Sequence, residues 1–326
     1  MSDDECIYFF FSNNRIKKRI LYKTPFISKL ISSVSFIQNE IHATNKLKAL
    51  KEYKKYYYLY DIIEKSQGLC DTSILTKYEN KGLVNFDTYL SSLSCSRLYI
   101  YTLIESYRHL LSAIVLLIDN KIIHNNINFE TIQTNKSNIL LTNFSHSIDI
   151  TRTNITRTDL NECMNKLCMN ETIKPIEIYL LSYLQTNKLD SISNNNINCI
   201  LDDLIEQYKI LRHFGAQIIQ QFRDDGAIFL QKYINKSIQF IYDDILTYYA
   251  TWDNYALSVS YLVVLIDIHK NIKHSNKFVI TFMRHLLENI SFNPIKRCTV
   301  ETTTNKFDKM IYEIEPSSYV LLINEL

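Results

Sequence analysis

The sequence predicts a folded α+β protein whose carboxyl-terminal part is mainly helical. Of the 326 residues, 46% are hydrophobic and 21% are charged, which is typical of a globular protein with a sizeable core. A long apolar-periodic segment spans residues 98–118, and further helical patterns span residues 176–185, 197–222 and 227–249. A cluster of aromatic residues that are typical of strands or of protein-binding surfaces precedes them: Tyr53, Tyr56, Tyr57, Tyr58 and Tyr60.

The most specific pattern lies in residues 122–145. After the apolar pair Ile122-Ile123, residues 124–131 read His-Asn-Asn-Ile-Asn-Phe-Glu-Thr. After a second apolar stretch, residues 143–145 read Asn-Phe-Ser. The order, the spacing and the flanking apolar residues resemble the protein-kinase signature, in which H-R-D-L-x-x-x-N is followed by D-F-G.

Other landmarks extend this resemblance to protein kinases over residues 75–310. Residues 75–90 resemble a kinase hinge that leads into the first helix of the large lobe. Pro175-Ile176-Glu177 resembles the A-P-E element, and residues 253–259 resemble the D-x-W-S-L-G-V start of the central helix. Residues 293–297 resemble the late loop whose arginine pairs with the A-P-E glutamate.

The resemblance implies a two-lobed protein kinase-like fold. A small β-rich N-lobe is expected at residues 1–78, and a large, mainly helical C-lobe at residues 79–326. The C-lobe carries a helical insertion at about residues 178–252, which is similar to that of kinase-like proteins of large DNA viruses. Residues 1–74 match the family poorly.

The resemblance also implies structural roles for three charged residues. Asp253 is expected to bond to the catalytic-loop backbone, and Glu177 is expected to pair with Arg297. A buried pair of this kind must be retained as a pair, because the loss of one partner costs about 3–5 kcal/mol. The residues that hold a kinase large lobe together are thus present.

The residues that would carry the chemistry of a kinase are replaced. Asn126 stands at the position of the catalytic aspartate, and an amide has neither the charge nor the basicity of a carboxylate. Asn143 stands where an aspartate binds the main Mg²⁺, and a neutral amide is a poor ligand for that ion. Thr131 replaces the asparagine that holds the second metal, and Asn128 replaces the catalytic-loop lysine. We expect a vestigial site without catalytic, cofactor-binding or metal-binding residues at His124, Asn126, Asn128, Thr131, Asn143 and Phe144.

The phosphate-binding part of a kinase is not recognisable in residues 1–74. The chain has four glycines and the first is Gly68, so no Gly-rich loop precedes that residue. Lys23 and Lys29 are candidates for the phosphate-binding lysine, and Glu40 is the candidate for its partner on a helix. Solvated surface charges are the alternative interpretation of all three. We therefore do not expect binding of ATP with Mg²⁺.

Charge and cysteine content bear on the partners and on the location. The net charge of +2 and the lack of zinc, helix-turn-helix and RNA-binding motifs argue against a nucleic-acid partner. Seven cysteines without a C-x-x-C pair indicate reduced thiols and a cytoplasmic location, in the host cytoplasm or the virion if the protein is viral. The acidic amino terminus argues against a secretory signal, and the longest apolar runs, residues 110–118 and 259–266, are too short to span a bilayer.

The residues that hold a kinase large lobe together are present, whereas those that carry kinase chemistry are replaced. This combination predicts a catalytically inactive pseudokinase that serves as a protein-interaction or structural scaffold. A composition typical of AT-rich genomes and the insertion indicate a minor capsid or virion component of a large DNA virus, with capsid proteins as partners. The insertion and the tyrosine cluster are the candidate contact surfaces. The alternative is a nucleotide-binding kinase-like enzyme with a non-standard site, in which Glu130 or Asp149 supplies a carboxylate and residues 77–79 accept an adenine. Residues 151–158 are either a site of phospho-regulation or a mobile polar loop.

Overall fold

The protein has a mixed α+β fold that is mostly helical, as the sequence predicts. The computed structural model describes the backbone of residues 8–12, 15–19, 26–31, 34–60, 62–65, 74–79, 82–151 and 174–326. Side chains are described for residues 38–60, 82–151 and 174–326. The predictions on Lys23 and on residues 152–158 lie outside the described residues, and Lys29 is described by its backbone alone.

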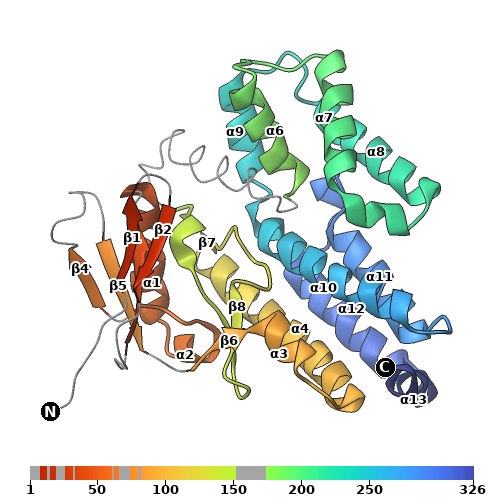
Figure 1. Cartoon of the computed structure of the whole chain (residues 1–326). Coiled ribbons are helices and arrows are strands. Elements are labelled where there is room, and N and C mark those ends of the chain that lie inside the picture. Colours follow the sequence, from red (N-terminus) through yellow and green to blue (C-terminus); the bar gives the residue numbers. More distant parts are fainter. Residues whose placement is uncertain are drawn as a thin grey trace, which may run out of the picture.

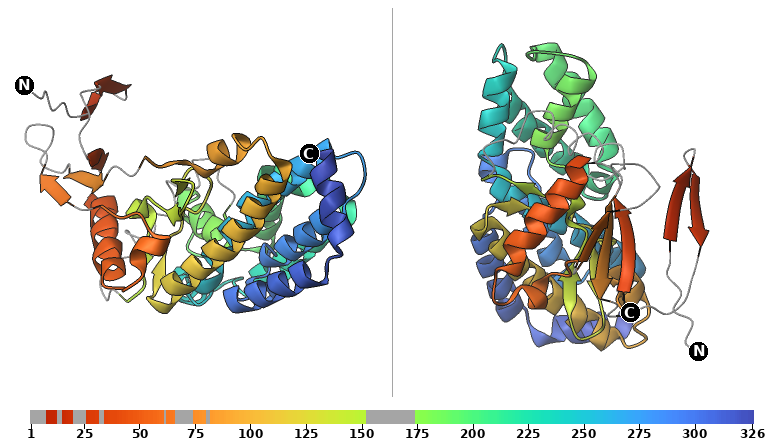
Figure 2. Two further views of the ribbon diagram at one scale, coloured as in Figure 1. Left: turned by 90° about the horizontal axis from the view of Figure 1, so that it is seen from below. Right: turned by 90° about the vertical axis from the view of Figure 1, so that its left-hand side faces the viewer.

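The amino-terminal part contains a small antiparallel sheet and one long helix. Strands β3 (Phe26–Ile31), β5 (Ile74–Glu79) and β4 (Ile62–Lys65) form the sheet in that order. Strands β1 (Tyr8–Ser12) and β2 (Arg15–Arg19) form a separate hairpin. Helix α1 (Val34–Lys48) lies beside the three-stranded sheet, at one end of the molecule (Figures 1 and 2).

Short strands frame the two loops of the kinase-like pattern. Strand β7 (Ile122–Ile123) ends just before His124 and pairs with β10 (Ile148–Asp149). Strands β6 (Val84–Asn85), β8 (Ile132–Thr134) and β9 (Ile139–Leu141) form a second small sheet. A short 3₁₀ helix, η1 (Phe144–His146), follows β9. Strand β7 pairs with β10 and β8 pairs with β9, both in antiparallel fashion. Residues 124–131 and 143–146 therefore lie at the same end of these strands.

The main helical body lies beside these strands, on the right of Figure 1. It consists of α3 (Phe86–Ser91), α4 (Ser96–Asp119), α10 (Trp252–Asn271), α11 (Lys277–Asn289), α12 (Val300–Glu313) and α13 (Pro316–Glu325). A cluster of edge-to-face aromatic rings fills its core, where Tyr107 contacts Tyr261, Phe282 and Phe307 at centroid distances of 4.8–5.1 Å. Helix α10 contacts α11 and α4, so it forms the centre of this body.

Helix α4 extends the predicted segment 98–118 by one or two residues at each end. Its leucines at 103, 110, 111 and 117 are fully buried, as the 3.6-residue period requires. By length and composition alone α4 is apolar enough to cross a membrane, and a buried core helix of a globular protein passes the same test. More than half of its apolar window is buried inside the protein, and we therefore assign it to the core.

The predicted insertion is helical, but its helices are shorter than expected. The segment contains α6 (Ile176–Thr186), α7 (Asn194–Gln207), η2 (Lys209–His213), α8 (Ala216–Gln231), α9 (Ile238–Leu246) and η3 (Tyr249–Thr251). The continuous helix expected at 197–222 is broken before α8, where Gly215 has a φ of 81°. The helix expected at 227–249 is broken before α9, where Asn235 has a φ of 57° and Ser237 caps the new helix.

The tyrosine cluster is neither a strand nor an exposed surface. Tyr53 begins the short helix α2 (Tyr53–Tyr56), and Tyr56, Tyr57, Tyr58 and Tyr60 are buried. Tyr57 donates a hydrogen bond of 2.6 Å to the carbonyl of Ala113 in α4. The expectation of a protein-binding surface here was wrong, because these rings pack inside the protein.

Three of the seven cysteines lie in the described side chains. Cys95, Cys199 and Cys298 are free thiols. The other four cysteines lie outside the described side chains.

Candidate functional site

The loop after β7 is held by one carboxylate of α10. Asp253 is buried in the first turn of that helix and accepts hydrogen bonds from the backbone N–H groups of His124, at 2.7 Å, and Asn125, at 2.8 Å. Burial raises the pKa of Asp253 to about 6, although these two N–H groups favour the charged form. The loop backbone is tightly turned at Asn125, where φ is 61°. Asp253 thus makes the contact with the loop that the sequence predicts.

His124 joins this loop to the segment after β9. Its ring Nε2 lies 2.9 Å from the carbonyl of Thr142, and its Nδ1 accepts the N–H of Asn126 at 3.3 Å. These partners assign the ring proton to Nε2. The ring of Phe144 stands edge-on to His124 at 4.7 Å and to Tyr57 at 5.7 Å. All three rings are buried, so the two loops share one interior.

The polar side chains of the first loop bond to one another and to the loop backbone. Asn128 donates to the side-chain oxygen of Asn126 at 3.3 Å, and its own oxygen accepts the N–H groups of Glu130 and Thr131. The Thr131 hydroxyl donates to the carbonyl of Asn126 at 2.8 Å and accepts the N–H of Asn128 at 3.1 Å. The side chains of Asn126, Asn128 and Thr131 therefore hold this loop in its shape.

The second loop is arranged in a similar way. Asn143 has a left-handed backbone, with a φ of 66°, and its side-chain oxygen accepts the hydroxyl proton of Ser145 at 2.7 Å. The Asn143 amide thus bonds to a neighbouring side chain at the start of η1.

The two proposed replacement carboxylates differ in their surroundings. Glu130 is exposed. Asp149 accepts hydrogen bonds from Lys46 of α1, at 2.9 Å, and from the hydroxyl of Thr151, at 2.7 Å. Burial alone would raise the pKa of Asp149, but these partners outweigh it and hold the pKa below its ordinary value. Asp149 is therefore a charged residue that ties α1 to the end of β10.

Glu40 lies in the interior of the protein. It is 1% exposed, so its interpretation as a solvated surface charge was wrong. Together with burial, which is the larger cause, its carboxylate raises the pKa of Tyr60 to about 12.

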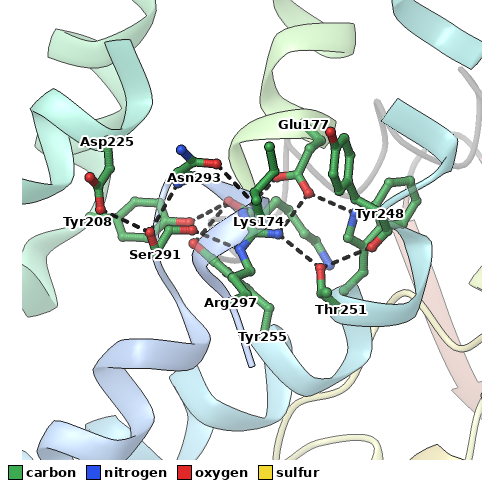
Figure 3. Close-up of polar contacts among 12 residues, drawn as sticks. Lys174, Glu177, Tyr208, Asp225, Tyr248, Thr251, Tyr255, Ser291, Asn293 and Arg297 are labelled. Atoms are coloured by element: carbon green, nitrogen blue, oxygen red, sulfur yellow. Dashed lines mark hydrogen bonds and ion pairs between the residues drawn. The ribbon is translucent and has the colours of Figure 1, made fainter. Parts of the chain in front are cut away.

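Glu177 and Arg297 form the buried ion pair that the sequence predicts (Figure 3). Both side chains are 0% exposed, and two parallel hydrogen bonds of 2.7 Å join the guanidinium to the carboxylate. The indole N–H of Trp252 donates to Glu177 at 3.1 Å, and the Arg297 Nε–H donates to the carbonyl of Ser291 at 2.8 Å. The Tyr255 ring lies 4.8 Å from the guanidinium carbon. This pair connects α6, the start of α10 and the loop before α12.

Lys174 belongs to the same region, and sequence reasoning missed it. It is buried, and its Nζ donates to the carbonyl of Asn125 at 3.0 Å. Its own carbonyl accepts the hydroxyl protons of Tyr208 and Tyr255 (Figure 3). The ammonium also favours the charged form of Asp253. The position next to Pro175 was the only signal, and lysine is usually exposed, so the sequence pattern did not identify it.

Among the side chains that the structure describes, no group of three or more His, Cys, Asp or Glu residues is placed to hold a metal ion. Comparison with known proteins gave no match, either to a protein-family model or to a curated protein. The kinase resemblance therefore rests on the residues described above.

Proposed function

We propose that this chain is a catalytically inactive pseudokinase that acts as a protein-interaction scaffold. In this proposal the amino-terminal sheet and α1 correspond to a kinase N-lobe, and the helical body corresponds to a C-lobe with an insertion. The proposal rests on two sets of residues. One set builds the interior of the candidate site, and the other stands where a kinase has its reacting groups.

The hydrogen bonds of Asn126, Asn128 and Thr131 carry the proposal. In a kinase the corresponding side chains face the substrate hydroxyl, the phosphate and the metal ion. In this chain they bond to each other and to the backbone of their own loop. Amides also have no charge with which to neutralise a transferring phosphoryl group, and such charges are usually the largest contribution to catalysis.

The buried anchors support the fold part of the proposal. Asp253 holds the loop, and the Glu177–Arg297 pair holds α6 against the start of α10. Neither interaction requires a nucleotide. A protein that keeps these interactions retains a rigid surface even where its central site is inactive.

The partners in this proposal are proteins, and capsid proteins are one such class if the source is a large DNA virus. The proposal then places the chain in the cytoplasm or in the virion, as a minor capsid component. The tyrosine cluster is buried, so the helices of the insertion are the remaining candidate for the contact surface.

Thermal unfolding of the purified chain with ATP, with and without Mg²⁺ or Mn²⁺, tests the loss of nucleotide chemistry. A ligand at 100 times its dissociation constant stabilises a protein by about 2.7 kcal/mol. We expect no shift with ATP, with either metal, or with both. A metal-dependent shift that disappears in the Asn143→Ala variant would overturn the proposal and favour a nucleotide-binding enzyme with a non-standard site. Ser137→Ala, in the exposed β8–β9 turn, is the matched control.

A further inference from the structure

Three aromatic rings surround the ammonium group of Lys232, at the end of α8. Its Nζ lies 4.5 Å from the ring centroid of Phe229, 4.7 Å from that of Tyr233 and 4.7 Å from that of Tyr248. It also donates hydrogen bonds to the carboxylate of Asp244, in α9, and to the Tyr248 hydroxyl at 2.9 Å. We call Phe229, Tyr233, Tyr248 and Asp244 the cage.

The cage is built independently of the lysine that fills it. Phe229 and Tyr233 are buried, and their rings stand edge-to-face at 5.3 Å, while Phe229 and Tyr248 do so at 5.8 Å. Tyr233 donates a hydrogen bond of 2.6 Å to Asp244. Burial alone would raise the pKa of Asp244, but its bonds to Lys232 and Tyr233 hold the pKa below the ordinary value. The cage therefore presents π faces and a negative charge to the same point.

Other lysine–ring contacts of the described residues are simpler. Lys236 lies 5.5 Å from the single ring of Phe240, and Lys121 lies 5.9 Å from that of Tyr249. Three rings and a carboxylate around one ammonium group form a site for an organic cation, because each face attracts positive charge. The side chains of Lys232 and Asp244 are 31% and 29% exposed, so the site opens to solvent.

We propose that the cage is a recognition site for a lysine ammonium group of a protein partner, and that Lys232 fills it in the free protein. The assignment of a protein partner rests on the proposed scaffold function, whereas the cation site does not. The side chain of Lys232 is 31% exposed and follows the last residue of α8, so the site opens when that side chain turns away into solvent. The partner lysine then replaces the same contacts.

The polar groups of the cage select the chemical form of the cation. Asp244 and the Tyr248 hydroxyl both accept hydrogen bonds from the ammonium group. An unmethylated, monomethylated or dimethylated ammonium keeps at least one N–H to donate, whereas a trimethylated one has none. The site therefore prefers an ammonium group that carries hydrogen over a quaternary one.

The test uses the full chain with Lys232→Ala and n-butylammonium as the probe, followed by NMR of the tyrosine rings. We expect saturable binding to this variant, and binding to the wild-type protein that is at least tenfold weaker, because Lys232 competes. Butyltrimethylammonium should bind more weakly than n-butylammonium. Addition of Tyr248→Phe, which removes only the acceptor hydroxyl, should weaken n-butylammonium binding, and Lys236→Ala is the matched control with no effect on the site.

Three results would overturn the proposal. The first is a folded Lys232→Ala variant that does not bind n-butylammonium. The second is equal binding to the variant and to the wild-type protein, which would place the binding elsewhere. The third is a wild-type protein that does not bind n-butylammonium at 100 times the concentration that saturates the Lys232→Ala variant. The cage would then serve only to bind Lys232 within the protein. A chain that binds ATP with Mg²⁺ but still shows the expected ammonium binding would remove the pseudokinase proposal alone.

Discussion

Substitution of the buried Arg297 measures how much the stability of the fold depends on its ion pair with Glu177. The Arg297→Met substitution keeps an unbranched side chain but leaves the Glu177 carboxylate without its bidentate partner, at a position that is 0% exposed. Among the residues that the structure describes, only the Trp252 N–H would still donate to that carboxylate. The carbonyl of Ser291 would lose the Nε–H donor at the same time.

We expect Arg297→Met to lower the free energy of unfolding by about 3–5 kcal/mol, the range for a buried pair that loses one partner. Glu177→Gln should fall in the same range, because it strands the guanidinium. In the double variant no charge is stranded, so its loss should be smaller than the sum of the two single losses by at least about 1 kcal/mol. An exposed pair supplies the control: Lys309 and Glu313 lie 3.7 Å apart, and Lys309→Ala should cost at most about 0.5 kcal/mol.

Equilibrium unfolding in urea measures these differences. Trp252 is the only tryptophan of the chain and is buried, so its fluorescence reports unfolding. Because Trp252 also donates to Glu177, far-UV circular dichroism must give the same midpoints. Losses below about 1 kcal/mol for both single variants, which is the range of an exposed pair, would refute the reasoning. Additive losses in the double variant would do so as well.

Three further predictions concern the interior and the loop. Burial raises the pKa of Asp253 from 3.8 to about 6, so the folded state favours the neutral form of this carboxyl group. The free energy of unfolding should therefore fall by about 3 kcal/mol as the pH rises from about 4 to about 6, and should then level off. Urea titrations at each pH measure the free energy of unfolding of the wild-type protein and of the non-titrating Asp253→Asn variant. Parallel curves of this free energy against pH for the two proteins would contradict the prediction. Gly226→Ala should cost on the order of 1–3 kcal/mol, because its Cβ would lie 2.5 Å from Leu201 Cδ2 and 3.2 Å from Ile176 Cδ1, and an unchanged urea midpoint would count against this packing. Asn126→Ala should leave partner binding unchanged in a pull-down with the natural partner, and loss of binding by a folded variant would argue against the scaffold role.

The sequence predicts best those features that depend on local periodicity or on an obligatory pair. Helix α4 was predicted to within two residues, because its apolar positions repeat over six turns without a break. The contact of Glu177 with Arg297 was predicted from the resemblance to protein kinases, and it agrees with the rule that a buried charge is retained together with its partner. The breaks at Gly215 and Asn235 were missed, since single left-handed residues do not interrupt an apolar pattern.

The contacts of Lys174 and Lys232 could not be predicted in the same way. Lys174 is held by groups that lie 34 to 81 residues away in the chain, and no short pattern records such distances. The cage around Lys232 combines residues of α8 and α9 with Tyr248, and each aromatic residue alone has an ordinary place in a helix. Tertiary packing therefore decides both environments.

Helix α10 explains how the loop after β7 keeps its shape. Asp253 binds the loop backbone, and Tyr255, two residues later, both stacks on Arg297 and donates to the carbonyl of Lys174. Lys174 in turn donates to the carbonyl of Asn125, so the loop is held from two sides. Asp253, Tyr255, Arg297 and Lys174 are buried and paired with one another or with the loop, so the chain itself supplies these contacts. An amide at Asn126 is compatible with this arrangement because it keeps the shape of a carboxylate without adding a second negative charge beside the loop that Asp253 already holds.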